Sequence, residues 1–163
     1  MRTGDTPAAT VACTTPEAVA AVVRDLDAAG RDVLVVGGGS NLVVGEDVGG
    51  LVVVLVTTGD DARLTGADAP APGDPAGGDV TVDRRTGTVR AFAGVTWDDL
   101  VARTVAEGLG GLECLSGIPG SVGATPVQNV GAYGAEVSQT LSRVHLHDRT
   151  TGRSGWVGPE DLD

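Results

Sequence analysis

The stretch Val33-Leu-Val-Val-Gly-Gly-Gly-Ser-Asn-Leu42 decides the fold class of this 163-residue chain. Its first four residues are wholly apolar and too few for a helix, so they predict a buried strand. The apolar run at residues 51–56 predicts a second strand of the same kind. A helical pattern precedes the first strand, and strands joined through a helix are ordinarily parallel. The sequence therefore predicts a parallel layer covered by a helix.

The helix predicted before the first strand carries both a start and a stop signal. Thr15 supplies a capping hydroxyl, Pro16 suits the first helical position, and Glu17 lies near the positive end of the helix dipole. Gly30 ends the pattern. We therefore expect residues 1–57 to form a first lobe of parallel strands and helices. The apolar stripe of the helix consists of Val19, Val22, Val23 and Leu26.

The second half of the chain changes from helix and parallel strand to antiparallel pairs. Residues 58–78 are rich in Ala, Pro, Gly and Asp, a composition that predicts a flexible excursion without chemistry. Residues 79–163 form the second predicted lobe. The strand pairs predicted in it are residues 80–83 with 88–93 and residues 141–148 with 154–157.

A second amphipathic helix is predicted after Thr96, because Thr96-Trp-Asp-Asp99 resembles a capping box with Asp in place of Glu. The acid pairs at residues 98–99 and 160–161 each lie at a predicted helix start, where acids are common. We assign them no catalytic role. Because a domain rarely ends inside its first helical turn, the start at residues 159–162 leads us to expect a truncated chain.

The three glycines after the first strand indicate a phosphate-binding loop. Without side chains, their backbone N–H groups can converge on an anion such as a pyrophosphate, and the Ser40 hydroxyl and Asn41 amide can add hydrogen bonds. The nicotinamide fingerprint fails, because its third glycine would fall at Leu42. The alternative is a tight turn that needs positive φ. The candidate residues are Gly37, Gly38, Gly39, Ser40, Asn41 and Leu42.

A second glycine-bearing segment is Leu115-Ser-Gly-Ile-Pro-Gly-Ser-Val-Gly-Ala-Thr-Pro-Val-Gln-Asn-Val-Gly-Ala-Tyr-Gly134. Small residues dominate it, so a planar ligand could approach its backbone amides closely. Gln128, Asn129 and Tyr133 are its side chains with reach. The alternative interpretation is a well-packed loop and a short helix, and the residues alone do not decide between the two.

Charge and composition exclude several classes of function. The net charge is -11, and the eleven positive residues are spread along the chain, which argues against nucleic acid as a partner. All eleven are arginines, so lysine-dependent phosphate loops and Schiff-base catalysis are excluded. No apolar run could span a bilayer, and no signal peptide is visible at the start. We expect no membrane partner and a cytoplasmic location.

The sequence predicts no metal site. His145 and His147 lie two apart on a predicted strand and so point the same way, but two ligands rarely suffice for a metal. Cys13 and Cys114 are too few and too far apart for a metal motif. We interpret them as two reduced thiols, one or both of them buried.

Residues 37–42 and 111–134 resemble the two signature regions of the UDP-N-acetylenolpyruvoylglucosamine reductase family, and residues 93–97 lie where that family has a similar segment. The resemblance extends from about Arg2 to the end of the chain. It implies an α+β fold, an FAD-binding domain of the p-cresol methylhydroxylase type. Such a domain has a small parallel α/β lobe and a larger lobe with a mainly antiparallel sheet.

The resemblance also implies a reaction. In this family NADPH reduces the flavin, and the UDP-sugar UDP-N-acetylenolpyruvoylglucosamine is reduced to UDP-N-acetylmuramate for peptidoglycan synthesis. FAD is thus the implied cofactor, NADPH the reductant and the UDP-sugar the partner. Residues 37–42 would hold the FAD phosphates, and Tyr133 would lie near the flavin or the substrate. The residues implied to border the pyrophosphate and flavin are Ile118, Pro119, Gly120, Ser121, Gly123 and Ala124.

The catalytic groups of the family are an arginine, a serine and a glutamate, and all three would fall beyond Asp163. We therefore assign no catalytic residue and expect the substrate domain to be absent. The amino terminus also departs from the family pattern, so FAD binding weaker than the family norm is expected. The alternatives are a non-catalytic flavin- or nucleotide-binding fragment and a related FAD oxidase. No histidine lies near either glycine segment, which argues against the covalent flavin attachment seen in such oxidases. No oligomeric state is predicted.

Overall fold

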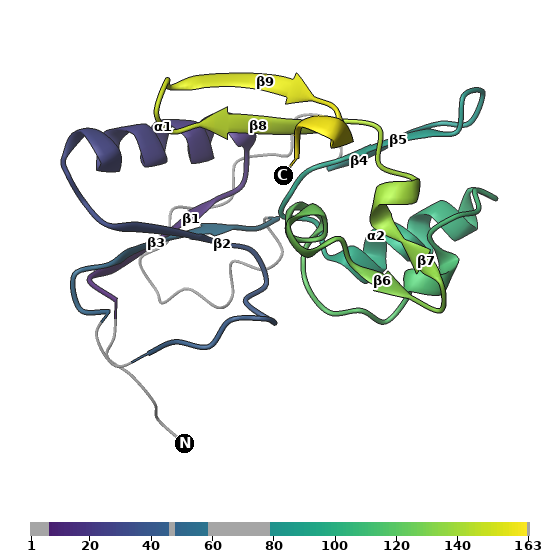
Figure 1. Cartoon of the computed structure of the whole chain (residues 1–163), viewed down its shortest axis with the longest axis horizontal. Helices are drawn as coiled ribbons and strands as arrows, with labels where there is room; N and C mark the ends of the chain where they lie inside the picture. The colour runs from purple at the N-terminus through teal and green to yellow at the C-terminus, as the bar shows by residue number, and fades with distance from the viewer. Residues whose placement is uncertain (1–6, 46–47, 59–78, 163) are drawn as a thin grey trace.

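The computed structural model describes residues 7–45, 48–58 and 79–162. We call residues 7–58 the N-terminal part and residues 79–162 the C-terminal part (Figure 1). Apart from Thr58, the predicted excursion at residues 58–78 lies outside the described residues. The lobe boundaries given above therefore remain a prediction.

The N-terminal part is a three-stranded parallel sheet with one helix packed on it (Figure 1). The strand order is β1-β3-β2, and both outer strands pair in parallel with β3. The predicted parallel layer is thus confirmed, with β1 as a strand that the sequence patterns did not indicate. The bounds are β1 Ala9–Cys13, α1 Pro16–Ala28, β2 Val33–Val36 and β3 Val52–Val56.

Local sequence rules shape α1. The Thr15 hydroxyl oxygen accepts a hydrogen bond of 3.1 Å from the Ala18 N–H, which confirms the predicted cap. Gly30 follows the helix with a φ of +65°, a conformation in which glycine carries no steric penalty. The small buried cluster between α1 and the sheet consists of Cys13, Val23 and Val54.

β2 is not the buried strand that its composition predicts. Val35 is 45% exposed, whereas Val54 on β3 is fully buried. β3 lies at the centre of the sheet and β2 at its edge, so β3 receives most of the cover. The expectation for residues 33–36 is wrong on this point, because the position of a strand in the sheet decides its burial.

The C-terminal part contains three separate two-stranded antiparallel sheets, the helix α2 (Trp97–Ala106) and several 3-10 turns. The predicted antiparallel style is confirmed. The predicted final helix is a single 3-10 turn, Pro159–Asp161. The strand pairs are β4 Val80–Asp83 with β5 Thr88–Ala91, β6 Gly131–Ala132 with β7 Ala135–Glu136, and β8 Val144–Asp148 with β9 Arg153–Val157. Its core consists of Val95, Trp97, Leu100, Val101, Leu115 and Val137.

The start of α2 differs from the prediction. Thr96 is the N-cap residue, but its side chain makes no capping hydrogen bond, so the expected capping box is not formed. Trp97 instead fixes the helix start, because its backbone N–H donates to the Gly120 carbonyl (2.9 Å) and its indole N–H to the Leu115 carbonyl (2.9 Å). The helix is therefore anchored by distant backbone groups and not by its own cap.

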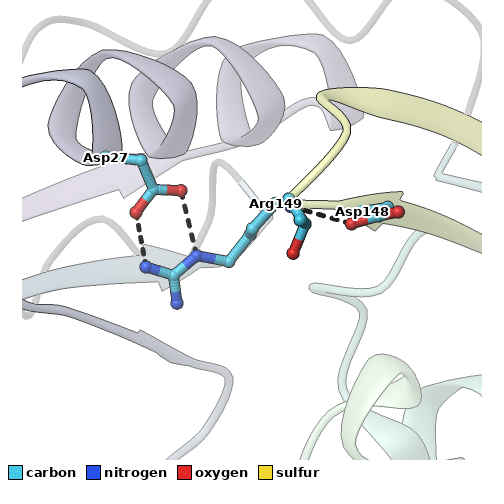
Figure 2. Close-up of polar contacts among 4 residues, drawn as sticks. Asp27, Asp148 and Arg149 are labelled. Carbon is cyan, nitrogen blue, oxygen red and sulfur yellow. Dashed lines mark hydrogen bonds and ion pairs between the residues drawn. The ribbon is translucent and has the colours of Figure 1, made fainter.

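The β8–β9 hairpin lies along α1 and joins the two parts of the molecule (Figure 1). The Arg149 guanidinium at the hairpin turn donates to both carboxylate oxygens of Asp27, at 3.0 and 2.5 Å (Figure 2). Asp148 accepts from the backbone N–H of Thr150 and so shapes the same turn (2.8 Å). These contacts position the hairpin on the helix.

The two histidines of β8 have protein partners. The His145 ring packs at 44° on Trp156, with 5.1 Å between centroids, and His147 Nδ1 lies 2.9 Å from the Ser154 hydroxyl. Within residues 7–45, 48–58 and 79–162, no group of three potential metal ligands is present. Of the two thiols, Cys13 is buried and Cys114 exposed. No described helix is long and apolar enough to cross a membrane.

Candidate functional site

The first glycine segment is a loop that leaves the carboxyl end of β2. Gly39 has a φ of +67°, and the Leu42 N–H donates to the Gly39 carbonyl (3.2 Å), so the segment does contain a tight turn. The backbone N–H groups of residues 38–41 have no acceptor among the described residues. Four consecutive donors are thus available to a ligand, which is the arrangement an anion-binding loop requires.

The second glycine segment packs directly against this loop. A Cβ atom on Gly37 would lie 2.1 Å from the Ser121 hydroxyl oxygen, and one on Gly38 would lie 3.5 Å from the Gly120 Cα. A Cβ on Gly120 would lie 3.3 Å from the Ser40 hydroxyl oxygen. The two segments, far apart in the sequence, therefore approach each other through positions that lack side chains. We call residues 37–41 with Gly120 and Ser121 the cradle.

Residues 93–97 hold the second segment in place. The Val122 N–H donates to the Val95 carbonyl (2.9 Å), and the Gly123 N–H donates to the Ala93 carbonyl (2.8 Å). A Cβ on Gly123 would lie 2.6 Å from the Ala93 Cβ, so this contact also requires glycine. Gly94, in turn, backs onto the chain at the end of β3, because a Cβ there would lie 2.8 Å from backbone atoms of Thr57.

The remaining residues of the second segment divide between core and surface. Ile118 is half-buried and packs against the core around Trp97, whereas Pro119 and Gly123 are exposed. Residues 122–124 form a 3-10 turn. Gly117 and Gly120 have φ values of +79° and +126°, so this path depends on glycine. The segment is therefore partly the packed loop that the sequence left open as an alternative.

Asp98 fixes the beginning of the second segment. One of its carboxylate oxygens, Oδ1, accepts hydrogen bonds from the Ser116 hydroxyl (2.8 Å) and from the Gly117 N–H (2.7 Å). These two bonds, that of Gly117 first, hold the pKa of the Asp98 carboxyl below its usual range. Asp98 belongs to a pair of acids at a predicted helix start, which is an ordinary place for acids, so no sequence pattern signalled this contact.

A side-chain hydrogen bond also joins the two segments. Asn41 Nδ2 donates to Gln128 Oε1 at 2.6 Å, and both side chains are exposed. The neighbouring Asn129 adopts a left-handed φ of 44°, donates to the Glu136 carboxylate (2.8 Å) and accepts from the Ser138 N–H (3.1 Å). The pairing of Asn41 with Gln128 was not predicted, although Asn41 had been singled out in the first glycine segment and Gln128 in the second.

Tyr133 lies in the turn between β6 and β7. Its φ is +54°, an uncommon value for a residue other than glycine, and its side chain is 92% exposed. No contact between Tyr133 and the cradle is present among the hydrogen bonds of the described residues. The structure brings the two glycine segments together, but it does not place Tyr133 against them.

The geometry of the cradle fits the pyrophosphate of a dinucleotide. Its backbone donors face no described acceptor, and a Cβ would intrude at Gly37. Its other polar groups are the Ser40 hydroxyl and the Asn41 amide, both uncharged. Binding at this site would therefore depend on backbone dipoles, as is usual where a glycine loop follows a parallel strand.

Comparisons with known proteins identify the family. Residues 7–63 and 77–154 match the FAD binding domain family. The chain is 61% identical, over 166 residues, to a UDP-N-acetylenolpyruvoylglucosamine reductase of Corynebacterium jeikeium strain K411, and 53% identical, over 157 residues, to one of Nocardia farcinica. These alignments cover 100% and 96% of this chain but only 38% and 35% of the relatives. The chain thus spans well under half of their length.

A solved structure agrees. The crystal structure of the reductase from Thermus caldophilus superposes with a TM-score of 0.59 and 29% sequence identity, over 93% of this chain and 45% of that one. The resemblance and the fold class expected from the sequence are both confirmed. The chain belongs to the FAD binding domain family, and it is homologous to the FAD-binding portion of UDP-N-acetylenolpyruvoylglucosamine reductases.

Proposed function

We propose that this chain binds FAD, with residues 37–42 around the phosphates and residues 118–124 along the pyrophosphate and flavin. The observation that carries the proposal is the close approach of Gly37 to Ser121, where a single added carbon would lie 2.1 Å from the hydroxyl oxygen. This packing brings the main chains of the two segments together beside the N–H groups of residues 38–41, which have no described acceptor, and membership of the FAD binding domain family names the ligand.

The proposed contacts follow from the groups that the cradle presents. The N–H groups of residues 38–41 would donate to phosphate oxygens, and Ser40 and Asn41 would add side-chain hydrogen bonds. The chain carries a net charge of -11, so attraction by the whole protein would not assist an anionic ligand. Affinity would instead depend on how well the loop is held in shape.

Tyr133 is proposed to lie near the flavin or the substrate. Its left-handed turn and 92% exposure support a functional role, because an aromatic side chain gains nothing for folding in that position. The Asn129–Glu136 hydrogen bond at the base of the β6–β7 turn keeps the backbone of this region fixed.

We further propose that the chain serves as the FAD-binding part of a reductase that converts UDP-N-acetylenolpyruvoylglucosamine to UDP-N-acetylmuramate with NADPH. The 61% identity to the Corynebacterium jeikeium reductase supports this. FAD supplies hydride transfer when bound. The residues of this chain would bind and orient the cofactor and exclude water from its phosphates, while the UDP-sugar and the proton-donating groups would depend on sequence outside the alignment. The lobes of residues 1–57 and 79–163 are proposed to enclose the cofactor together.

A titration with FAD tests the first proposal. The purified chain is titrated while flavin fluorescence quenching and melting temperature are followed. Gly38→Asp would place a carboxylate beside the backbone donors and is expected to abolish binding. Its Cβ itself fits, since the nearest atom, the Gly120 Cα, would lie 3.5 Å away. Gly155→Asp is the matched control, since its Cβ position on β9 meets nothing within 4 Å. A folded chain that shows no saturation at high micromolar FAD would contradict the proposal.

A chimera tests the reductase. Residues 1–163 replace the aligned portion of the Corynebacterium jeikeium reductase, and NADPH oxidation is measured with the UDP-sugar present and absent. We expect substrate-dependent turnover that Gly38→Asp removes and Gly155→Asp leaves. A chimera that binds FAD without turnover would favour a non-catalytic flavin-binding role, and turnover with oxygen and an alcohol would favour a related oxidase.

A further inference from the structure

Asp98 makes contacts that an acid at a helix start does not ordinarily make. Such acids usually interact with the free N–H groups of their own helix. Asp98 instead directs Oδ1 at the loop before residue 118, where it accepts from the Ser116 hydroxyl at 2.8 Å and from the Gly117 N–H at 2.7 Å. Hydrogen bonds to an ionised acceptor are the stronger kind, so the contact is a firm one for an exposed residue.

Trp97 anchors the same loop from the adjoining position. Its indole N–H donates to the Leu115 carbonyl, and its backbone N–H donates to the Gly120 carbonyl, both at 2.9 Å. Together with Asp98, this gives anchors at residues 115–117 on one side of Ile118 and at Gly120 on the other. The start of α2 therefore brackets the stretch that enters the cradle.

The bracketed stretch has little structure of its own. The N–H groups of Ile118, Gly120 and Ser121 have no acceptor among the described residues. Gly117 and Gly120 at its two ends both have positive φ, so the backbone there has a wide choice of conformations when it is not held. The path of residues 118–121 must be set by the anchors at its ends.

We propose that Asp98 is a positioning residue for the flavin-binding segment, which it acts on through Ser116 and Gly117; this inference rests on the proposed binding of FAD. The hydrogen-bond partners of Asp98, Ser116 and Gly117, lie outside the cradle. By fixing the residues before Ile118, it presents the free N–H groups of Ile118, Gly120 and Ser121 in one arrangement before the ligand arrives. Preorganisation of this kind raises affinity, because less conformational freedom is lost on binding.

Four variants of the 163-residue chain test the inference. Asp98→Ala removes both hydrogen bonds and is expected to raise the Kd for FAD by roughly tenfold, the scale of one charge-assisted hydrogen-bond anchor. Asp98→Asn keeps Oδ1 as an acceptor and is expected to recover most of the affinity. Ser116→Ala removes one bond and should have an intermediate effect. Asp99→Ala is the matched control: it removes the same charge from the same helical turn, and no hydrogen bond of Asp99 is present among the described residues.

Two further readouts separate positioning from stability. The visible circular dichroism of bound FAD, recorded at saturation, reports the environment of the flavin, and the melting temperature without FAD reports folding. We expect Asp98→Ala to alter the flavin spectrum and Asp98→Asn to restore it. A lower melting temperature with an unchanged Kd and spectrum would overturn the inference. If Asp98→Ala fails to fold, the same comparison is made with Ser116→Ala.

The outcomes distinguish this inference from the proposed function. If the wild-type chain binds FAD and the Asp98 and Asp99 variants bind it equally well, the inference is overturned and FAD binding stands. If the folded wild-type chain does not bind FAD, both fail together. If Asp98→Ala weakens binding most, Ser116→Ala weakens it less, and Asp98→Asn and Asp99→Ala change it little, the positioning role is supported.

Discussion

The two α-helices in the described part of the chain begin in opposite ways. α1 is capped by its own Thr15, whose hydroxyl accepts from the Ala18 N–H, whereas the N-cap Thr96 of α2 makes no such bond. α2 is held instead by Trp97, which donates to carbonyl groups well along the chain. The start of α1 is thus set by a neighbour in the sequence, and the start of α2 by contacts with distant residues.

The two glycine segments of the cradle show the same difference. The loop at residues 37–41 needs only a parallel strand before it and glycines within it, and its turn closes locally from Gly39 to Leu42. The segment at residues 118–124 is tied to residues 93–97 by three backbone hydrogen bonds, at Gly120, Val122 and Gly123. One side of the proposed FAD site is therefore encoded locally and the other by tertiary structure.

Among the variants that test how the two helices are held, Trp97→Ala is expected to have the largest effect on stability. Trp97 is 2% exposed in the C-terminal core, so Trp97→Ala leaves a cavity and removes the indole N–H that donates to the Leu115 carbonyl. We expect a loss of about 3–5 kcal/mol in the free energy of unfolding, measured by chemical denaturation.

The control for this change is Trp156→Ala. Trp156 is 48% exposed, with Arg90 5.1 Å above its ring, and its loss is expected to cost about 1 kcal/mol or less. Equal losses at the two tryptophans would contradict the view that α2 is held chiefly through Trp97.

The contact between the two segments can be broken by Gly37→Ala. The added methyl group would lie 2.1 Å from the Ser121 hydroxyl oxygen and 3.1 Å from its Cβ, so overpacking is expected to cost about 1–3 kcal/mol. Ser121→Ala removes the nearer atom and should restore part of the loss in the double variant. Urea denaturation of the two single variants and the double variant measures this coupling.

The control is Gly45→Ala, in open space, which should not be coupled to Ser121. If the changes in the free energy of unfolding caused by Gly37→Ala and Ser121→Ala simply add in the double variant, contact with Ser121 is not the reason why a side chain at position 37 is unfavourable.

The sequence predicted what local chemistry determines. The cap at Thr15, the parallel pairing of β2 with β3 and the two strand pairs with turn signals follow from propensity and spacing, and the structure confirms them. The prediction from sequence failed where the hydrogen-bond partner of a residue lies far away along the chain. Asp98 looked like a helix-start acid because its real partners, Ser116 and Gly117, cannot be seen in its neighbours.

The predicted burial of β2 was wrong for a related reason. An apolar run predicts a strand but not its place in the sheet, and β2 lies at an edge where Val35 stays 45% exposed. For the candidate site, motif resemblance identified both segments, yet the fit of Gly37 against Ser121 and the Asn41–Gln128 hydrogen bond required the fold. Which residues touch the cofactor remains a prediction.

A smaller test compares the two helix starts directly. Thr15→Ala removes a capping hydrogen bond and is expected to cost about 1 kcal/mol. Thr96→Ala removes no capping bond, so its effect should stay within about 0.5 kcal/mol. Thermal unfolding of the two variants beside the wild type measures the difference. A larger effect at Thr96 would mean that α2 is locally capped after all.

The smallest effect concerns the ion pair that joins the two parts. The Arg149 hydrogen bonds hold the pKa of Asp27 below its ordinary value, and the charge of Arg149 and of His147 acts in the same direction. A carboxyl with a lowered pKa in the folded state stabilises the protein above its ordinary pKa, about 3.9, and loses that contribution as pH falls from there through the folded value.

Asp27→Asn should therefore lower the melting temperature slightly at pH 7 and have no effect in strong acid, where Asp27 is protonated in the folded and unfolded chains alike. Asp25→Asn is the control for the charge change. Asp25 lies two residues before Asp27 on α1, and its ion pair with Arg24 is a long one, at 3.9 Å between Arg24 Nε and Asp25 Oδ1. The difference between the two variants, followed from pH 7 downward, isolates the contact in Figure 2. A difference that persists unchanged into strong acid would show that Asp27 supports the hairpin by packing, and that the two parts are joined without help from this charge.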